Sequence, residues 1–169
     1  MQFVAVAAGA VHSLALTEEG HVYGWGDGRA NGHGQEQRTP QRVGALAGVR
    51  VLLVYAHEYS SCAVTEKGEL YTWGIGDLNT FHLGYIVDAP QPTLKRVEAL
   101  SRVKVVAAAT CDSHTLVAGE DGMIWGFGER AALGLGEADA PPGEDEDSDD
   151  EGWVLQPTRI PSLRVRTLP

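Results

Sequence analysis

The chain is poor in cysteine and in basic residues, and it lacks any long hydrophobic run. Its two cysteines, Cys62 and Cys111, have no C-x-x-C spacing within the 169 residues, which argues against a disulfide framework or a zinc site. Thirteen lysines and arginines against 23 aspartates and glutamates do not provide the basic surface of a direct nucleic-acid binder. No apolar run approaches the roughly 20 residues of a transmembrane helix. We therefore expect a cytoplasmic or nuclear protein without membrane insertion.

The negative charge is concentrated in one low-complexity stretch, residues 138–152. This composition favours a solvated loop over packed structure. The alternative is a docking site for a basic partner, which the charge would attract over a long range. Trp153, directly after the stretch, is then either an anchor for that partner or a pin for the end of the loop. The candidate partner-binding residues are Glu144, Asp145, Glu146, Asp147, Asp149, Asp150, Glu151 and Trp153.

The sequence contains one internal repeat in three copies. The copies are AVAAGAVHSLALTEEGHVYGWGDG at 5–28, LVYAHEYSSCAVTEKGELYTWGIG at 53–76 and VAAATCDSHTLVAGEDGMIWGFGER at 106–130. A repeat every 50 residues or so indicates stacked supersecondary units that share their cores with their neighbours.

Each copy predicts a β-hairpin followed by further short strands. Two runs with alternating apolar residues flank a polar turn that ends in glycine, at Gly20, Gly68 and Gly122, which is typical of a hairpin. A second pattern follows, at 39–46 and 93–100, with a weaker third copy at 159–163. Its proline suits an edge strand or a strand start. About four short strands in roughly 50 residues predict an all-β fold of propeller blades.

The repeat resembles that of the regulator of chromosome condensation (RCC1) family. The first copy carries the resemblance on Gly9, His12, Ser13, Leu14, Gly20, Tyr23, Trp25 and Gly26. The second carries it on Ser61, Gly68, Tyr71, Trp73, Gly74, Leu83 and Gly84. The third carries it on His114, Thr115, Leu116, Gly122, Trp125, Gly126, Gly128, Leu133 and Gly134. The family's fold implies a seven-bladed propeller, of which this chain supplies about three blades.

The copies also depart from one another. The second has Ser60 where the others have His12 and His114, and the third has Phe127 at the position of the repeat tryptophan. We divide the chain into units at 1–48, 49–102 and 103–169, the last including the acidic stretch and, from residue 163, the start of a next blade. The remaining blades would come from the same longer chain or from another chain.

No group of residues predicts catalysis. His12 and His114 share one repeat position, so we expect buried histidines that donate hydrogen bonds to neighbouring backbone. The run Asp112-Ser113-His114 holds the residue types of a triad, but consecutive strand residues alternate between faces and cannot form a relay. The glycines between 24 and 34 lack the lysine and the helix of a phosphate-binding loop. We therefore expect no enzyme activity, no cofactor and no metal site.

The resulting hypothesis is a scaffold or adaptor that binds proteins through the loops of its blades. The resemblance implies two alternatives. One is a guanine-nucleotide exchange factor for a small GTPase, associated with chromatin. The other is the substrate-binding propeller of a large ubiquitin ligase. The partners expected are proteins, such as a small GTPase or a basic protein of the histone type.

Overall fold

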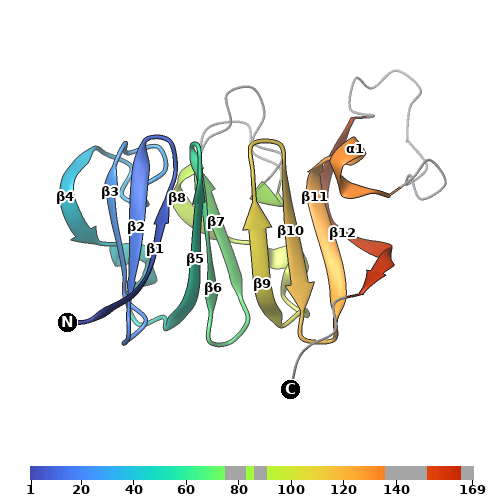
Figure 1. Cartoon of the computed structure of the whole chain (residues 1–169), viewed down its shortest axis with the longest axis horizontal. Coiled ribbons are helices and arrows are strands. Elements are labelled where there is room, and N and C mark those ends of the chain that lie inside the picture. Colours follow the sequence, from blue (N-terminus) through green and yellow to red (C-terminus); the bar gives the residue numbers. More distant parts are fainter. Residues whose placement is uncertain (75–82, 86–90, 136–151, 165–169) are drawn as a thin grey trace.

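The computed structural model describes residues 1–74, 83–85, 91–135 and 152–164. Three antiparallel sheets of four strands each stand side by side along the chain (Figure 1). Within each sheet the strands neighbour one another in chain order. The all-β fold and the three partial-propeller blades predicted from the repeats are thus confirmed.

Each blade is a meander of four strands, in which a glycine turn reverses the chain between the second and third strands. Blade 1 holds β1 (Phe3–Ala8), β2 (His12–Thr17), β3 (Val22–Gly26) and β4 (Gln37–Arg42). Blade 2 holds β5 (Val51–His57), β6 (Ser60–Thr65), β7 (Leu70–Gly74) and β8 (Gln91–Arg96). Blade 3 holds β9 (Val105–Thr110), β10 (His114–Gly119), β11 (Met123–Glu129) and β12 (Trp153–Arg164). Short helical turns, η1 (Gly44–Leu46), η3 (Glu98–Leu100) and α1 (Arg130–Leu133), join or follow these strands.

The predicted hairpin turns are present. Gly20, Gly68 and Gly122 have φ of 83°, 77° and 78°, a region that glycine enters without steric cost. In the third blade the last strand is longer than the predicted segment at 159–163. It begins at Trp153 and includes Leu163 and Arg164, so residues 163 and 164 belong to blade 3, which corrects the prediction that a next blade starts at 163.

Two hydrophobic clusters lie between the blades, and a third lies on blade 3 itself, around Ile124, Leu133 and Ile160. One cluster joins Leu14, Leu16 and Val22 of blade 1 to blade 2, where Trp73 is fully buried. A second cluster joins blades 2 and 3 around Phe127, which is also fully buried. Trp73 of blade 2 and Phe127 of blade 3 hold the same repeat position. Trp73 lies between blades 1 and 2, and Phe127 lies between blades 2 and 3. In the second and third repeats this aromatic residue therefore packs against the preceding blade.

The face of blade 1 that points away from blade 2 carries exposed apolar side chains. Trp25, at the same repeat position, is only half-buried. On β1 of that blade Phe3 is 44% and Val6 78% exposed, whereas Val51 and Val54 at the corresponding positions of β5 are buried. The outer face of blade 1 therefore carries apolar residues at the same repeat positions that form the interface between blades 1 and 2.

Candidate functional site

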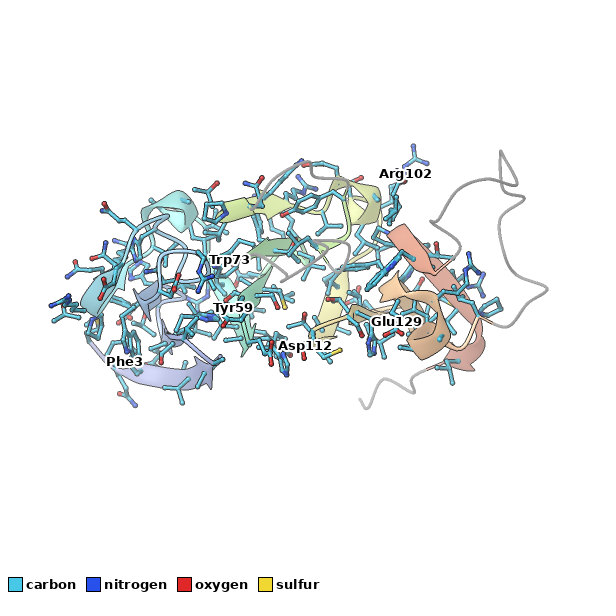
Figure 2. All side chains as sticks on the ribbon, turned by 90° about the horizontal axis from the view of Figure 1, so that it is seen from above. Phe3, Tyr59, Trp73, Arg102, Asp112 and Glu129 are labelled. Atoms are coloured by element: carbon cyan, nitrogen blue, oxygen red, sulfur yellow. The ribbon has the colours of Figure 1, made fainter. Side chains whose placement is uncertain are left out.

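One edge of the three blades gathers the turns that follow the first and third strands of each blade. The first and third strands of each blade run in the same direction, so the turns that follow them lie at the same edge (Figure 1, upper side). We call this edge the loop face and define it as residues 9–11, 27–36, 58–59, 111–113 and 129–135. Viewed from above, it spans from blade 1 past Tyr59 and Asp112 to Glu129 of blade 3 (Figure 2).

Buried hydrogen bonds fix the loop face between blades 1 and 2. The Nε2 atom of His12 lies 2.6 Å from Ser61 Oγ. Ser61 Oγ donates to the Ala30 carbonyl at 3.1 Å, and Trp73 Nε1 donates to the same carbonyl at 2.7 Å. The serine oxygen therefore accepts from the protonated Nε2 of the histidine. These bonds hold the 27–36 loop of blade 1 against blade 2.

His12 is buried, as predicted. The structure adds a partner that was not predicted, because the imidazole reaches the hydroxyl of Ser61 in the next blade. Burial lowers the pKa of His12, because a charged imidazolium is costly away from water. The side chain is thus a neutral structural contact at neutral pH.

Charged and aromatic groups cover these contacts on the solvent side. Arg29 forms an ion pair with Asp27 at 2.9 Å, and its guanidinium lies 4.7 Å from the centre of the Tyr59 ring in blade 2. Hydrogen bonds from Arg29 lower the pKa of Asp27. An open depression of about 680 Å³ lies beside this pair, lined by Val11, Asp27, Arg29 and Glu36 among others.

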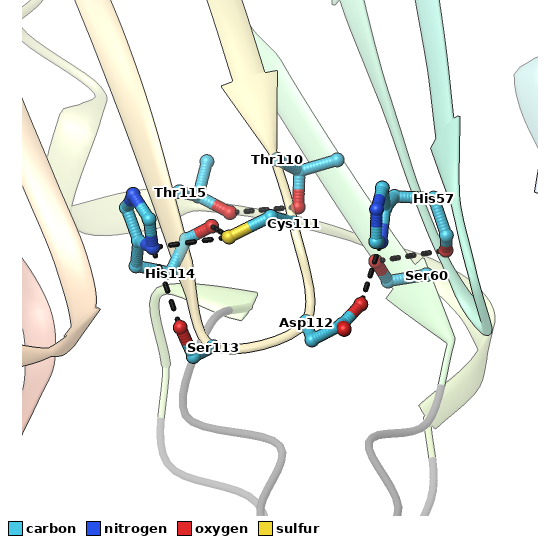
Figure 3. Close-up of polar contacts among 8 residues, drawn as sticks. All are labelled: His57, Ser60, Thr110, Cys111, Asp112, Ser113, His114 and Thr115. Carbon is cyan, nitrogen blue, oxygen red and sulfur yellow. Dashed lines mark hydrogen bonds and ion pairs between the residues drawn. The ribbon is translucent and has the colours of Figure 1, made fainter. Parts of the chain in front are cut away.

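Between blades 2 and 3 the loop face is joined by an ion pair. His57 Nδ1 lies 2.7 Å from Asp112 Oδ1, and both side chains are about half-exposed (Figure 3). Asp112 therefore pairs with the other blade and not with His114. Asp112 and Ser113 lie in a turn and not in a strand, so the predicted alternation of faces does not apply to them. Ser113 Oγ lies 3.4 Å from His114 Nδ1, and no Asp-His-Ser relay forms.

Of the predicted partner-binding residues, only one lies within the described part of the chain. Trp153 begins β12, is half-buried, and lies opposite Glu129 of β11. Next to it the Arg130 backbone N–H donates to the Gly152 carbonyl at 2.8 Å. The acidic residues Glu144, Asp145, Glu146, Asp147, Asp149, Asp150 and Glu151 lie outside the described residues.

The described residues offer no evident place for a metal or a membrane span. In 1–74, 83–85, 91–135 and 152–164 no three His, Cys, Asp or Glu side chains are grouped so as to hold a metal ion. Within the same ranges no helix has the length and apolar character needed to cross a membrane.

Sequence reasoning missed the contacts of His57, Tyr59, Asp112 and Cys111 on the loop face. Tyr59, Cys111 and Asp112 lie in the turn between the first two strands of their blades, and His57 is the last residue of β5. The repeat has little pattern of its own there. The alignment of the copies could have drawn attention to two of these residues, because Cys111 and His57 stand where the first copy has Gly9.

Comparison with known proteins points in one direction. The profile described as "Regulator of chromosome condensation (RCC1) repeat" matches residues 3–35. The chain is 31% identical over 152 residues to the human probable E3 ubiquitin-protein ligase HERC6, covering 83% of this chain and 14% of that protein. It is 32% identical over 143 residues to the ultraviolet-B receptor UVR8 of Arabidopsis thaliana, covering 80% of this chain and 32% of the receptor.

Solved structures show the same arrangement of blades. Human WBSCR16 superposes with a TM-score of 0.74 at 28% identity, covering 95% of this chain and 38% of its own. Prp20p of Saccharomyces cerevisiae, studied together with its binding to Gsp1p and histones, superposes with a TM-score of 0.74 at 24% identity, over 95% and 39% of the two chains. The chain thus spans less than two fifths of each of these relatives.

Proposed function

Because this chain belongs to the RCC1-repeat family of β-propeller proteins, we propose that it is a protein-binding module that holds its partner on the loop face and performs no chemistry. The observation that supports this most is the way the face is fixed. Inter-blade contacts of Ser61, Trp73 and Asp112 hold turns from three blades in one arrangement. A surface held in place before binding loses little entropy when a partner docks.

The charge of this face favours a basic protein as partner. Glu36, Glu58, Asp112 and Glu129 are all exposed on it, and the acidic stretch 138–152 joins α1 to β12 in the sequence, directly after the loop face. The nearby Arg29 is already paired with Asp27. Complementary charge speeds encounter and selects among partners. Because the yeast relative Prp20p was studied for its binding to histones, core histones are a suitable first probe.

The test uses the full chain and purified core histones, with binding measured by biolayer interferometry at several salt concentrations. We expect binding that weakens with salt and that falls about tenfold or more when Glu58→Lys and Glu129→Lys are combined. Glu19→Lys is the matched control, because Glu19 is exposed in a turn at the opposite edge of blade 1. Equal weakening by the control variant, or no binding by the wild type, would contradict the proposal.

Exchange activity on a small GTPase is the second candidate function, and the binding of yeast Prp20p to Gsp1p is the reason to test it. The measurement is release of a fluorescent guanine nucleotide from a small nuclear GTPase with and without the chain. Acceleration that Glu58→Lys and Glu129→Lys leave unchanged would replace the proposal above with an exchange factor. A role as the substrate-binding part of a ubiquitin ligase, as the resemblance to HERC6 suggests, agrees with protein binding and adds no chemistry to these residues.

A further inference from the structure

The turn between β9 and β10 places a thiol against an imidazole. Cys111 Sγ lies 3.0 Å from His114 Nδ1 and 3.4 Å from the His114 carbonyl oxygen (Figure 3). The contact is at the end of blade 3 on the loop face, where both side chains are half-buried. A nucleophile within hydrogen-bond reach of a base is the local arrangement from which thiol chemistry starts.

The pair is particular to the third blade. In blade 1 the position of Cys111 is Gly9, where an added Cβ would lie only 2.4 Å from His12 Cε1. The imidazole of blade 1 thus occupies the space above the glycine and reaches across to blade 2. Blade 2 has His57 and Ser60 at the two positions, without a thiol. Only the third copy combines a cysteine and a histidine across this turn.

The second cysteine shows the opposite environment. Cys62 is 1% exposed in the cluster between blades 2 and 3. Burial raises the pKa of its thiol to about 12, because the thiolate is unstable away from water. A reagent that reacts with thiolates therefore has one accessible target in the folded chain, and Cys62 is an internal control.

We propose that Cys111 is a modification site for small uncharged carbon electrophiles, with His114 as the base that takes its proton. In the first step the S–H proton moves to His114 Nδ1, which leaves a thiolate beside an imidazolium. In the second step the sulfur forms a bond to the electrophilic carbon. With an alkyl iodide the carbon–iodine bond breaks, and iodide departs with the electron pair.

The neighbouring charges are compatible with this step. Asp112 is engaged with His57 at 2.7 Å, so its carboxylate is directed away from the thiol (Figure 3). Glu129 lies on the same edge of the blade, where its backbone N–H donates to the Ser113 carbonyl at 2.8 Å.

The test is alkylation of the native chain by iodoacetamide at pH 7, followed by peptide mass spectrometry. We expect Cys111 to react about tenfold or more faster than N-acetylcysteine, and about tenfold or more faster than Cys111 in His114→Gln. Cys62 should stay unmodified until the chain is unfolded in urea. Cys111→Ser confirms the assignment of the modified peptide.

Three results would overturn the proposal. Cys111 reacting no faster than N-acetylcysteine would show that the thiol is not activated, and this comparison holds even if the His114 variant does not fold. Equal rates in wild type and a folded His114→Gln would show that the imidazole takes no part. Labelling of Cys62 at the rate of Cys111 would show that the reagent reacts through opening of the blades.

Discussion

Replacement of Trp73 by alanine should remove a large part of the stability of the chain. The indole is fully buried between blades 1 and 2, and truncation of a buried tryptophan typically costs about 3–5 kcal/mol through lost burial and an unfilled cavity. The lost hydrogen bond adds little, because the Ala30 carbonyl still accepts from Ser61 Oγ at 3.1 Å. We therefore expect Trp73→Ala to lower the free energy of unfolding by about 3–5 kcal/mol.

Two further variants test whether the stability comes from the buried packing of Trp73 or from an aromatic residue at this repeat position in any blade. Trp73→Phe keeps an aromatic ring that the fold already uses at Phe127, so it should cost only about 1–3 kcal/mol, from the smaller volume and the lost N–H donor. Trp25→Ala changes the same repeat position on a half-buried outer face. Its cost should be clearly smaller than that of Trp73→Ala.

The assay is urea unfolding followed by far-ultraviolet circular dichroism, since removing a tryptophan would also change the fluorescence signal. The free energy of unfolding comes from linear extrapolation. Trp73→Ala within about 1 kcal/mol of wild type, or Trp25→Ala as costly as Trp73→Ala, would refute the reasoning that the inter-blade aromatic residue carries the core.

Three other outcomes are expected. Gly74→Ala should destabilise the fold by about 2 kcal/mol or more, because Gly74 has a φ of 126° and an added Cβ would lie 2.2 Å from the Tyr59 carbonyl oxygen. Gly44→Ala is the control. An added Cβ there has nothing within 4 Å, so this variant should be near neutral in the same urea titration. Burial lowers the pKa of His12, so the unfolded chain takes up a proton that the folded chain does not; stability should fall as the pH drops below about 6.5, and His12→Gln should reduce this slope in melting curves recorded from pH 7.5 to 5. Deletion of 140–151, which interrupts no repeat position, should leave the melting temperature within a few degrees of wild type, and a large fall would show that the stretch supports the fold.

Much of the fold was predictable because its rules are local. The glycines at the hairpin turns and the alternation along the strands locate β2, β3 and their counterparts without reference to the rest of the molecule. Trp73 and Phe127, at the repeat aromatic position, are buried, whereas Trp25 at the same position is half-buried. The length of β12 did not follow, because its first residues, from Trp153 on, pair with β11 and carry no repeat pattern of their own.

The polar contacts of the loop face were less accessible to sequence reasoning. The ion pair of His57 with Asp112 joins residues 55 positions apart along the chain in two different blades, and the contact depends on how the blades stand beside each other. The hydroxyl partner of His12 is likewise in the next blade. Contacts between units are set by the geometry of stacking, which a repeat pattern within one unit does not contain.

The different aromatic residues on successive blades have a consequence for folding fidelity. Repeats that are nearly alike risk pairing with the wrong neighbour while the chain is still being made. Here the Ala30 carbonyl accepts hydrogen bonds from Ser61 and Trp73, whereas the next interface is filled by Phe127, which has no such donor. A blade that skipped its neighbour would leave this carbonyl without the indole. The difference between the two interfaces therefore favours the pairing of each blade with its own neighbour.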